Sequence, residues 1–141
     1  MRMKACFVSV IILIAAQSGR AQQPQDPLGD NLFPPELVMQ HQEEIGLTEA
    51  QKNVLKTESR KAALRFTELQ WQLADAGEKL AGLVKQPRVD EQQAIAALDQ
   101  ILDVEREIKR LQISLVIRTK NTLTPEQQAK LQDIKNKTRP K

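Results

Sequence analysis

Apolar residues recur at helical spacing through most of this chain, and polar stretches separate them into four blocks. In the two long blocks the apolar positions alternate three and four residues apart. This spacing is typical of a helix that packs lengthwise along a neighbouring helix. The pattern therefore predicts an all-α protein with four helices, at residues 34–45, 48–85, 90–120 and 124–136.

Turn and capping residues define how these helices begin and end. Pro87 lies between the two long blocks, and the residue before a proline is biased away from helix. So short a connection makes neighbouring helices antiparallel. We therefore expect a thin, elongated hairpin whose helices are about 57 and about 46 Å long. Asp90, followed by Gln93, is expected to open the second long helix, and Gly46 is expected to end the first short one.

Both long helices carry more apolar residues than one seam requires. A second stripe on the later helix comprises Ile95, Leu98, Leu102, Ile113 and Val116. The short helices, a second copy of the chain, or a bound partner could cover these residues. On the earlier helix, basic residues surround the surplus apolar ones, a combination suited to holding unfolded chains. The candidate client-binding residues are Arg60, Lys61, Leu64, Arg65, Phe66 and Trp71.

The N-terminus has the pattern of a secretory signal. Arg2 and Lys4 precede a twelve-residue apolar run, and Ala21 is a suitable residue for cleavage. The run is too short to span a bilayer as a helix, and an uncleaved N-terminal anchor is the alternative. The expected organisation is a signal at residues 1–21, a flexible linker at 22–33, a helical domain at 34–136 and a basic tail at 137–141.

Composition narrows the function classes. The chain has a net charge of +3, but its first 21 residues hold three basic and no acidic side chains. The remainder is therefore neutral, which argues against nucleic acid as a partner. The single cysteine, Cys6, lies in the leader, so the exported part must be held together by packing without disulfides.

Candidate chemistry is sparse. The chain has one histidine and no constellation of nucleophile and base, which argues against an enzyme and predicts no cofactor. One histidine without a second histidine or a cysteine also falls short of a closed transition-metal site. The residues considered as metal ligands are Met39, His41, Glu43 and Glu44.

One short pattern, L-T-x-x-Q, occurs twice in the sequence. A threonine followed three residues later by glutamine is a capping box, in which each side chain bonds to the backbone N–H of the other residue. Each copy is therefore expected to begin a helix. The motif residues are Leu47, Thr48 and Gln51 in the first copy, and Leu123, Thr124 and Gln127 in the second.

This recurrence resembles the LTxxQ-motif family of bacterial periplasmic proteins, the Spy/CpxP group. The resemblance implies a periplasmic location, four helices and a cradle-like antiparallel homodimer. Spy-like members hold unfolded envelope proteins on an apolar and basic surface without ATP, and CpxP-like members also damp a membrane sensor kinase. The resemblance thus implies a chaperone or envelope-stress modulator. Related proteins of this fold bind metals through several histidines, so a metal-responsive periplasmic sensor is the alternative.

Overall fold

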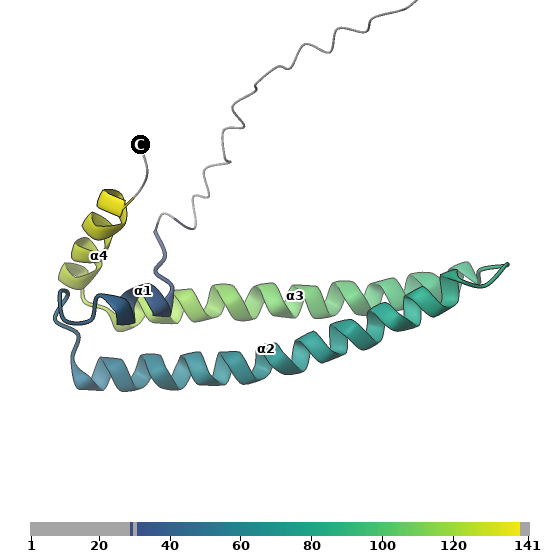
Figure 1. Cartoon of the computed structure of the whole chain (residues 1–141), viewed down its shortest axis with the longest axis horizontal. Coiled ribbons are helices and arrows are strands. Elements are labelled where there is room, and N and C mark those ends of the chain that lie inside the picture. Colours follow the sequence, from purple (N-terminus) through teal and green to yellow (C-terminus); the bar gives the residue numbers. More distant parts are fainter. Residues whose placement is uncertain (1–28, 30, 139–141) are drawn as a thin grey trace, which may run out of the picture.

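The computed structural model describes residue 29 and residues 31–138, so the expected signal lies outside the described residues. Two long helices, α2 and α3, pack side by side as an antiparallel hairpin, while α1 and α4 gather at its open end (Figure 1). The predicted all-α class and the long hairpin are confirmed. The helices are α1 (Pro35–Gln40), α2 (Glu49–Val84), α3 (Glu91–Thr122) and α4 (Pro125–Thr138).

The predicted apolar seam joins α2 to α3. With 36 and 32 residues, the two helices are about 54 and about 48 Å long. Leu69, Ala76 and Ala97 are buried between them. The two alanines lie in the half of the hairpin nearer the turn, where the helices converge (Figure 1). Small side chains at these positions let the two helices approach closely. No residue from 77 to 96 is buried.

The first helix is shorter than predicted. α1 ends at Gln40, and turns occupy residues 41–46, where a continued helix was expected. The helical ladder tightens at this point, since the N–H of Gln42 donates to the carbonyl of Met39, three residues back. The resulting turn brings both Ile45 and Leu47 into the buried core.

Gly46 ends this turn region, as the sequence predicts. Its φ angle is +69°, in the left-handed region that favours glycine. The N–H of Gly46 donates to the carbonyl of Glu43 (3.2 Å), and that of Leu47 donates to the carbonyl of Gln42 (2.8 Å). These two bonds form a Schellman motif, which satisfies carbonyls that the end of a helix leaves unpaired.

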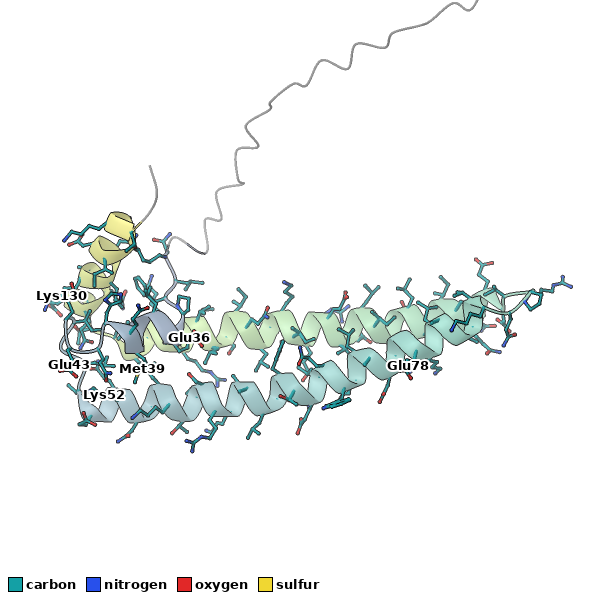
Figure 2. All side chains as sticks on the ribbon, viewed as in Figure 1. Glu36, Met39, Glu43, Lys52, Glu78 and Lys130 are labelled. Atoms are coloured by element: carbon teal, nitrogen blue, oxygen red, sulfur yellow. The ribbon has the colours of Figure 1, made fainter. Side chains whose placement is uncertain are left out.

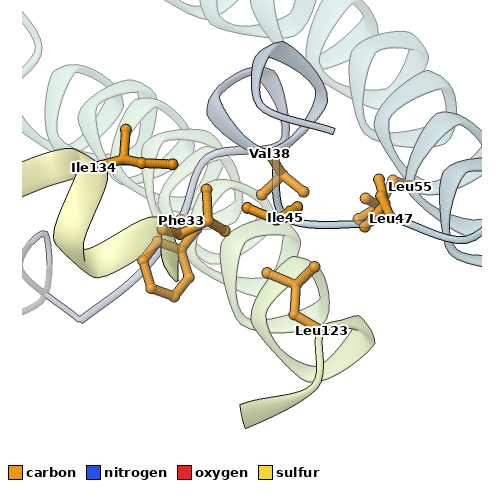
Figure 3. Close-up of a cluster of buried hydrophobic side chains, with 8 residues drawn as sticks. Phe33, Val38, Ile45, Leu47, Leu55, Leu123 and Ile134 are labelled. Atoms are coloured by element: carbon orange, nitrogen blue, oxygen red, sulfur yellow. The ribbon is translucent and has the colours of Figure 1, made fainter. Parts of the chain in front are cut away.

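A hydrophobic core, here called the head core, lies at the open end of the hairpin (Figure 3). Two lysines hold the segment before α1, residues 31–33, against this core. Lys120 of α3 donates to the carbonyl of Asn31 (2.9 Å), and Lys135 of α4 donates to that of Leu32 (3.3 Å) and lies 5.5 Å from the ring centroid of Phe33. The head core comprises Phe33, Val38, Ile45, Leu47, Leu55, Leu123, Leu131 and Ile134.

Candidate functional site

Both copies of the L-T-x-x-Q motif form a capping box. The N–H of Thr48 donates to Gln51 Oε1 (3.0 Å), and the N–H of Gln51 donates to Thr48 Oγ1 (3.2 Å). The second copy has the same pair of bonds, at 3.0 and 3.3 Å between Thr124 and Gln127. The motif thus begins α2 and α4 in the same way.

The two motif glutamines also bond to each other, in an arrangement here called the glutamine pair. The amide nitrogen of Gln51 donates to Gln127 Oε1 (2.8 Å), and that of Gln127 donates to Gln51 Oε1 (3.1 Å). Each glutamine also crosses to the residue before the other motif. Gln51 donates to the carbonyl of Thr122 (2.8 Å), and Gln127 donates to that of Gly46 (3.0 Å).

The glutamine pair uses every N–H donor of both side-chain amides. Gln127 is only 7% exposed, and the motif leucines Leu47 and Leu123 are buried in the head core beside it. The pair joins the start of α2 to the point where α3 passes into α4. The motif is therefore the joint that fixes the hairpin to the head, and it offers no open binding surface.

The predicted client-binding residues lie on different sides of α2. Leu64 and Trp71 are 67% and 70% exposed, the largest exposed fractions among the exposed large apolar side chains of the described residues. They are seven residues apart, and Arg60 lies one turn before Leu64, so the three share the side of α2 opposite the seam. This set is here called the outer α2 patch.

The other three candidates turn toward neighbouring groups. Phe66 is half-buried and lines a crevice of about 220 Å³ between α1, α2 and α3. Arg65 donates to Glu107 of α3 through Nε (3.0 Å) and to Glu68 (2.8 Å). Lys61 is exposed beside the outer α2 patch, and its Nζ lies 3.4 Å from Oε1 of Glu58.

Ion pairs link the two long helices on one face of the hairpin. Besides the pair between Arg65 and Glu107, Arg118 of α3 lies 2.6 Å from Glu58 of α2. The hydrogen bond from Arg118 holds the pKa of the Glu58 carboxyl below its ordinary value of 4.5. The hydrogen bond to Glu107 raises the pKa of the Arg65 guanidinium. Glu58 and Arg65 therefore keep their charges at neutral pH.

An open groove of about 1100 Å³ lies beside this face, and sequence reasoning missed it. Four of its lining residues are spaced four, three and four positions apart, which places them on one line of α3 opposite the seam. They are Arg106, Arg110, Ile113 and Ile117. This spacing in the sequence could have predicted a basic and apolar surface on the outside of α3. The lining of this α3 groove is Arg65, Asp103, Arg106, Glu107, Lys109, Arg110, Leu111, Ile113, Ser114, Ile117 and Arg118.

The predicted second stripe of α3 is open within one chain. Ile95, Leu98, Leu102 and Ile113 are exposed, and Val116 is half-buried. The short helices do not cover this stripe, because they gather at the head (Figure 1). These five residues are here called the α3 stripe.

The residues considered as metal ligands do not converge on one point. Nδ1 of His41 lies 3.1 Å from Oε2 of Glu44, while Glu43 faces Lys52, with 3.5 Å between Oε1 and Nζ (Figure 2). Met39 packs against the head core. Within the described part of the chain, no three His, Cys, Asp or Glu side chains are grouped so that they could hold a metal ion. These residues do not fit a closed metal site.

The motif residues are taken up in the structural joint between the hairpin and the head. The exposed surfaces of α2 and α3 are therefore what remains to carry a function. Residues 5–130 match the heavy-metal resistance family, and because this match covers most of the chain, the protein belongs to that family, the LTxxQ or Spy/CpxP-like group. The family consists of periplasmic, chaperone-like proteins that are not known as enzymes. No curated protein and no solved structure matches the chain. None of the four described helices combines the length and apolar character needed to cross a bilayer.

Proposed function

We propose that this protein is a periplasmic holding chaperone that binds unfolded envelope proteins without ATP, on the outer α2 patch. The observation that carries the proposal is the exposure of Leu64 and Trp71 on the side of α2 opposite the seam. Exposed apolar side chains of this size are typical of interaction surfaces. Arg60 adds a positive charge that attracts acidic segments of a client over a longer range.

Export and regulation belong to the same proposal. The leader at residues 1–21 would direct the chain to the periplasm, where the family is found. Damping of a membrane sensor kinase is a second output, supported by family membership. The alternative of a metal-responsive sensor is supported by the family's description as heavy-metal resistance, but the described residues offer no fitting set of donors.

The chaperone proposal is tested by light scattering from citrate synthase unfolding at elevated temperature, without ATP. We expect the chain from residue 22, which contains every described residue, to suppress aggregation at a several-fold molar excess. The double variant Leu64→Gln/Trp71→Gln should lose most of this suppression, because it removes both large apolar side chains of the patch and keeps good helix formers.

A matched control is available near the turn of the hairpin. Val84 and Val89 are 54% and 43% exposed, so Val84→Gln/Val89→Gln removes exposed apolar surface elsewhere and should leave suppression intact. Absence of suppression by the unmodified chain would refute the chaperone proposal. An equal loss in both double variants would show that the outer α2 patch is not the client surface.

We further propose that two copies pair through the α3 stripe in an antiparallel homodimer. The stripe has one apolar group around Leu98 and another around Ile113, on either side of Glu105 and Lys109. An antiparallel arrangement places the first group of one copy against the second group of its partner. It also sets Glu105 opposite the partner's Lys109, whereas a parallel arrangement sets like charges opposite each other.

Sedimentation equilibrium tests the homodimer. We expect twice the mass of one chain for the protein from residue 22, and one chain mass for Leu98→Glu/Leu102→Glu, because a buried unpaired carboxylate opposes association. The Leu64→Gln/Trp71→Gln variant serves as the control and should remain a dimer, since its changes lie on α2. A single-chain mass for the unmodified protein at micromolar concentration would contradict this arrangement.

A further inference from the structure

We propose that the α3 groove is a docking surface for an anionic lipid bilayer, independent of client binding. The surface is the line of Arg106, Arg110, Ile113 and Ile117, with Arg118 at its edge. These side chains project from α3 on the side opposite the seam, so they protrude from the hairpin and can meet a flat surface. The line spans about 16 Å of helix, which is enough for contact with several lipid headgroups.

Charge gives the first argument for this partner. The groove has five basic and two acidic side chains in its lining. Three of the arginines have carboxylate partners, Arg65 with Glu68 and Glu107, Arg106 with Asp103, and Arg118 with Glu58. Arg110 makes no ion pair within the described part of the chain. A guanidinium in this position suits a phosphate, which it can bind with two parallel hydrogen bonds.

The apolar residues give the second argument. Ile113 and Ile117 are 40% and 43% exposed, one helical turn apart, directly after Arg106 and Arg110. At a bilayer surface the isoleucines can enter the boundary of the acyl chains while the longer arginines stay at the level of the phosphates. An acidic peptide would satisfy the charges, but the open and outward-facing groove does not enclose a peptide as a cleft would.

The bilayer surface is compatible with the proposed homodimer. Around the circumference of α3, Leu98, Leu102 and Val116 lie on one side of Ile113, and Ile117, Arg110 and Arg118 lie on the other. Ile113 is therefore the border between the α3 stripe and the α3 groove. A dimer that buries the stripe also buries Ile113, but it leaves Ile117 and the basic side of the groove uncovered. In the homodimer, Ile117 is therefore the isoleucine that enters the boundary of the acyl chains.

Cosedimentation with lipid vesicles tests the proposal, using the chain from residue 22. We expect binding to vesicles of two parts phosphatidylcholine and one part phosphatidylglycerol at low salt, and weak binding to phosphatidylcholine alone. Arg106→Glu/Arg110→Glu should weaken binding at least about tenfold, since it reverses two charges at the surface. Ile117→Gln, which keeps the charge, should weaken it by a smaller factor. Far-UV circular dichroism checks that each variant remains helical.

The control variant is Lys85→Glu/Arg88→Glu, which makes the same charge change at the exposed turn of the hairpin. Retained binding by this control supports the proposal. An equal loss in both charge variants would mean that only the overall charge of the protein attracts it to the vesicles, and this would overturn the proposal. Equal binding to both kinds of vesicle, or to neither, would also overturn the proposal. Release of the chain by millimolar inorganic phosphate would indicate a site for a free anion instead. Binding of polyglutamate without binding of vesicles would assign the groove to a protein partner.

Discussion

Replacing Phe33 with alanine should lower the free energy of unfolding by about 3–5 kcal/mol. The ring is 2% exposed in the head core, and its neighbours come from segments far apart in the sequence (Figure 3). Removing it leaves a cavity that these segments cannot easily close and removes the contact with Lys135. Because typical domains are stable by only 5–15 kcal/mol, so large a change should be plain in urea unfolding followed by circular dichroism.

Phe66→Ala is the matched control for this variant. It makes the same chemical change at a half-buried position on α2, where the ring lines an open crevice. We expect a clearly smaller loss, because part of this ring is already in contact with water. If the two variants lost equal stability, the head core would not be the main site of apolar burial in the protein.

Gln127→Ala should cost about 2–4 kcal/mol of unfolding free energy, because it breaks several part-buried hydrogen bonds at once and leaves their other partners unsatisfied. The groups affected are the N–H of Thr124, the carbonyl of Gly46 and the amide of Gln51. A double-mutant cycle with Gln51→Ala should give a coupling energy of about 1–3 kcal/mol, since the two side chains bond directly. Both free energies are measured by urea unfolding.

Gln70→Ala provides the control for the cycle. Gln70 is exposed on α2, so its replacement should change stability by no more than about 0.5 kcal/mol. Additive costs for Gln51→Ala and Gln127→Ala would mean that the two capping boxes act separately. The glutamine pair would then not be the joint between the hairpin and the head.

The periodicity of apolar residues was enough to predict the hairpin, because the seam between two helices follows directly from the spacing of apolar residues along each of them. Leu69, Ala76 and Ala97 lie where that spacing places them. The capping boxes were likewise visible, because each depends on two residues three apart. The early end of α1 was not predicted, since its apolar residues fit a longer helix equally well and the core selects the turn that buries both Ile45 and Leu47.

The candidate surfaces were only partly predictable. Helical spacing alone put Leu64 and Trp71 on the outside of α2. The direction of Arg65 depends on Glu107, 42 residues later in the chain, and no local pattern connects the two. The glutamine pair has the same origin, because its members are 76 residues apart and meet only when α3 brings its end back to the start of α2.

The uneven distribution of buried residues along the hairpin also has a mechanical consequence. Helices α2 and α3 are held together at the head core and have no buried residue between positions 77 and 96. Mechanically, the hairpin therefore resembles a beam that is fixed at one end. For such a beam the thermal excursions grow with distance from the clamp, and the turn near Pro87 should sway most. In the proposed homodimer, such bending would let the protein hold clients of different size without disturbing the contacts of the head core.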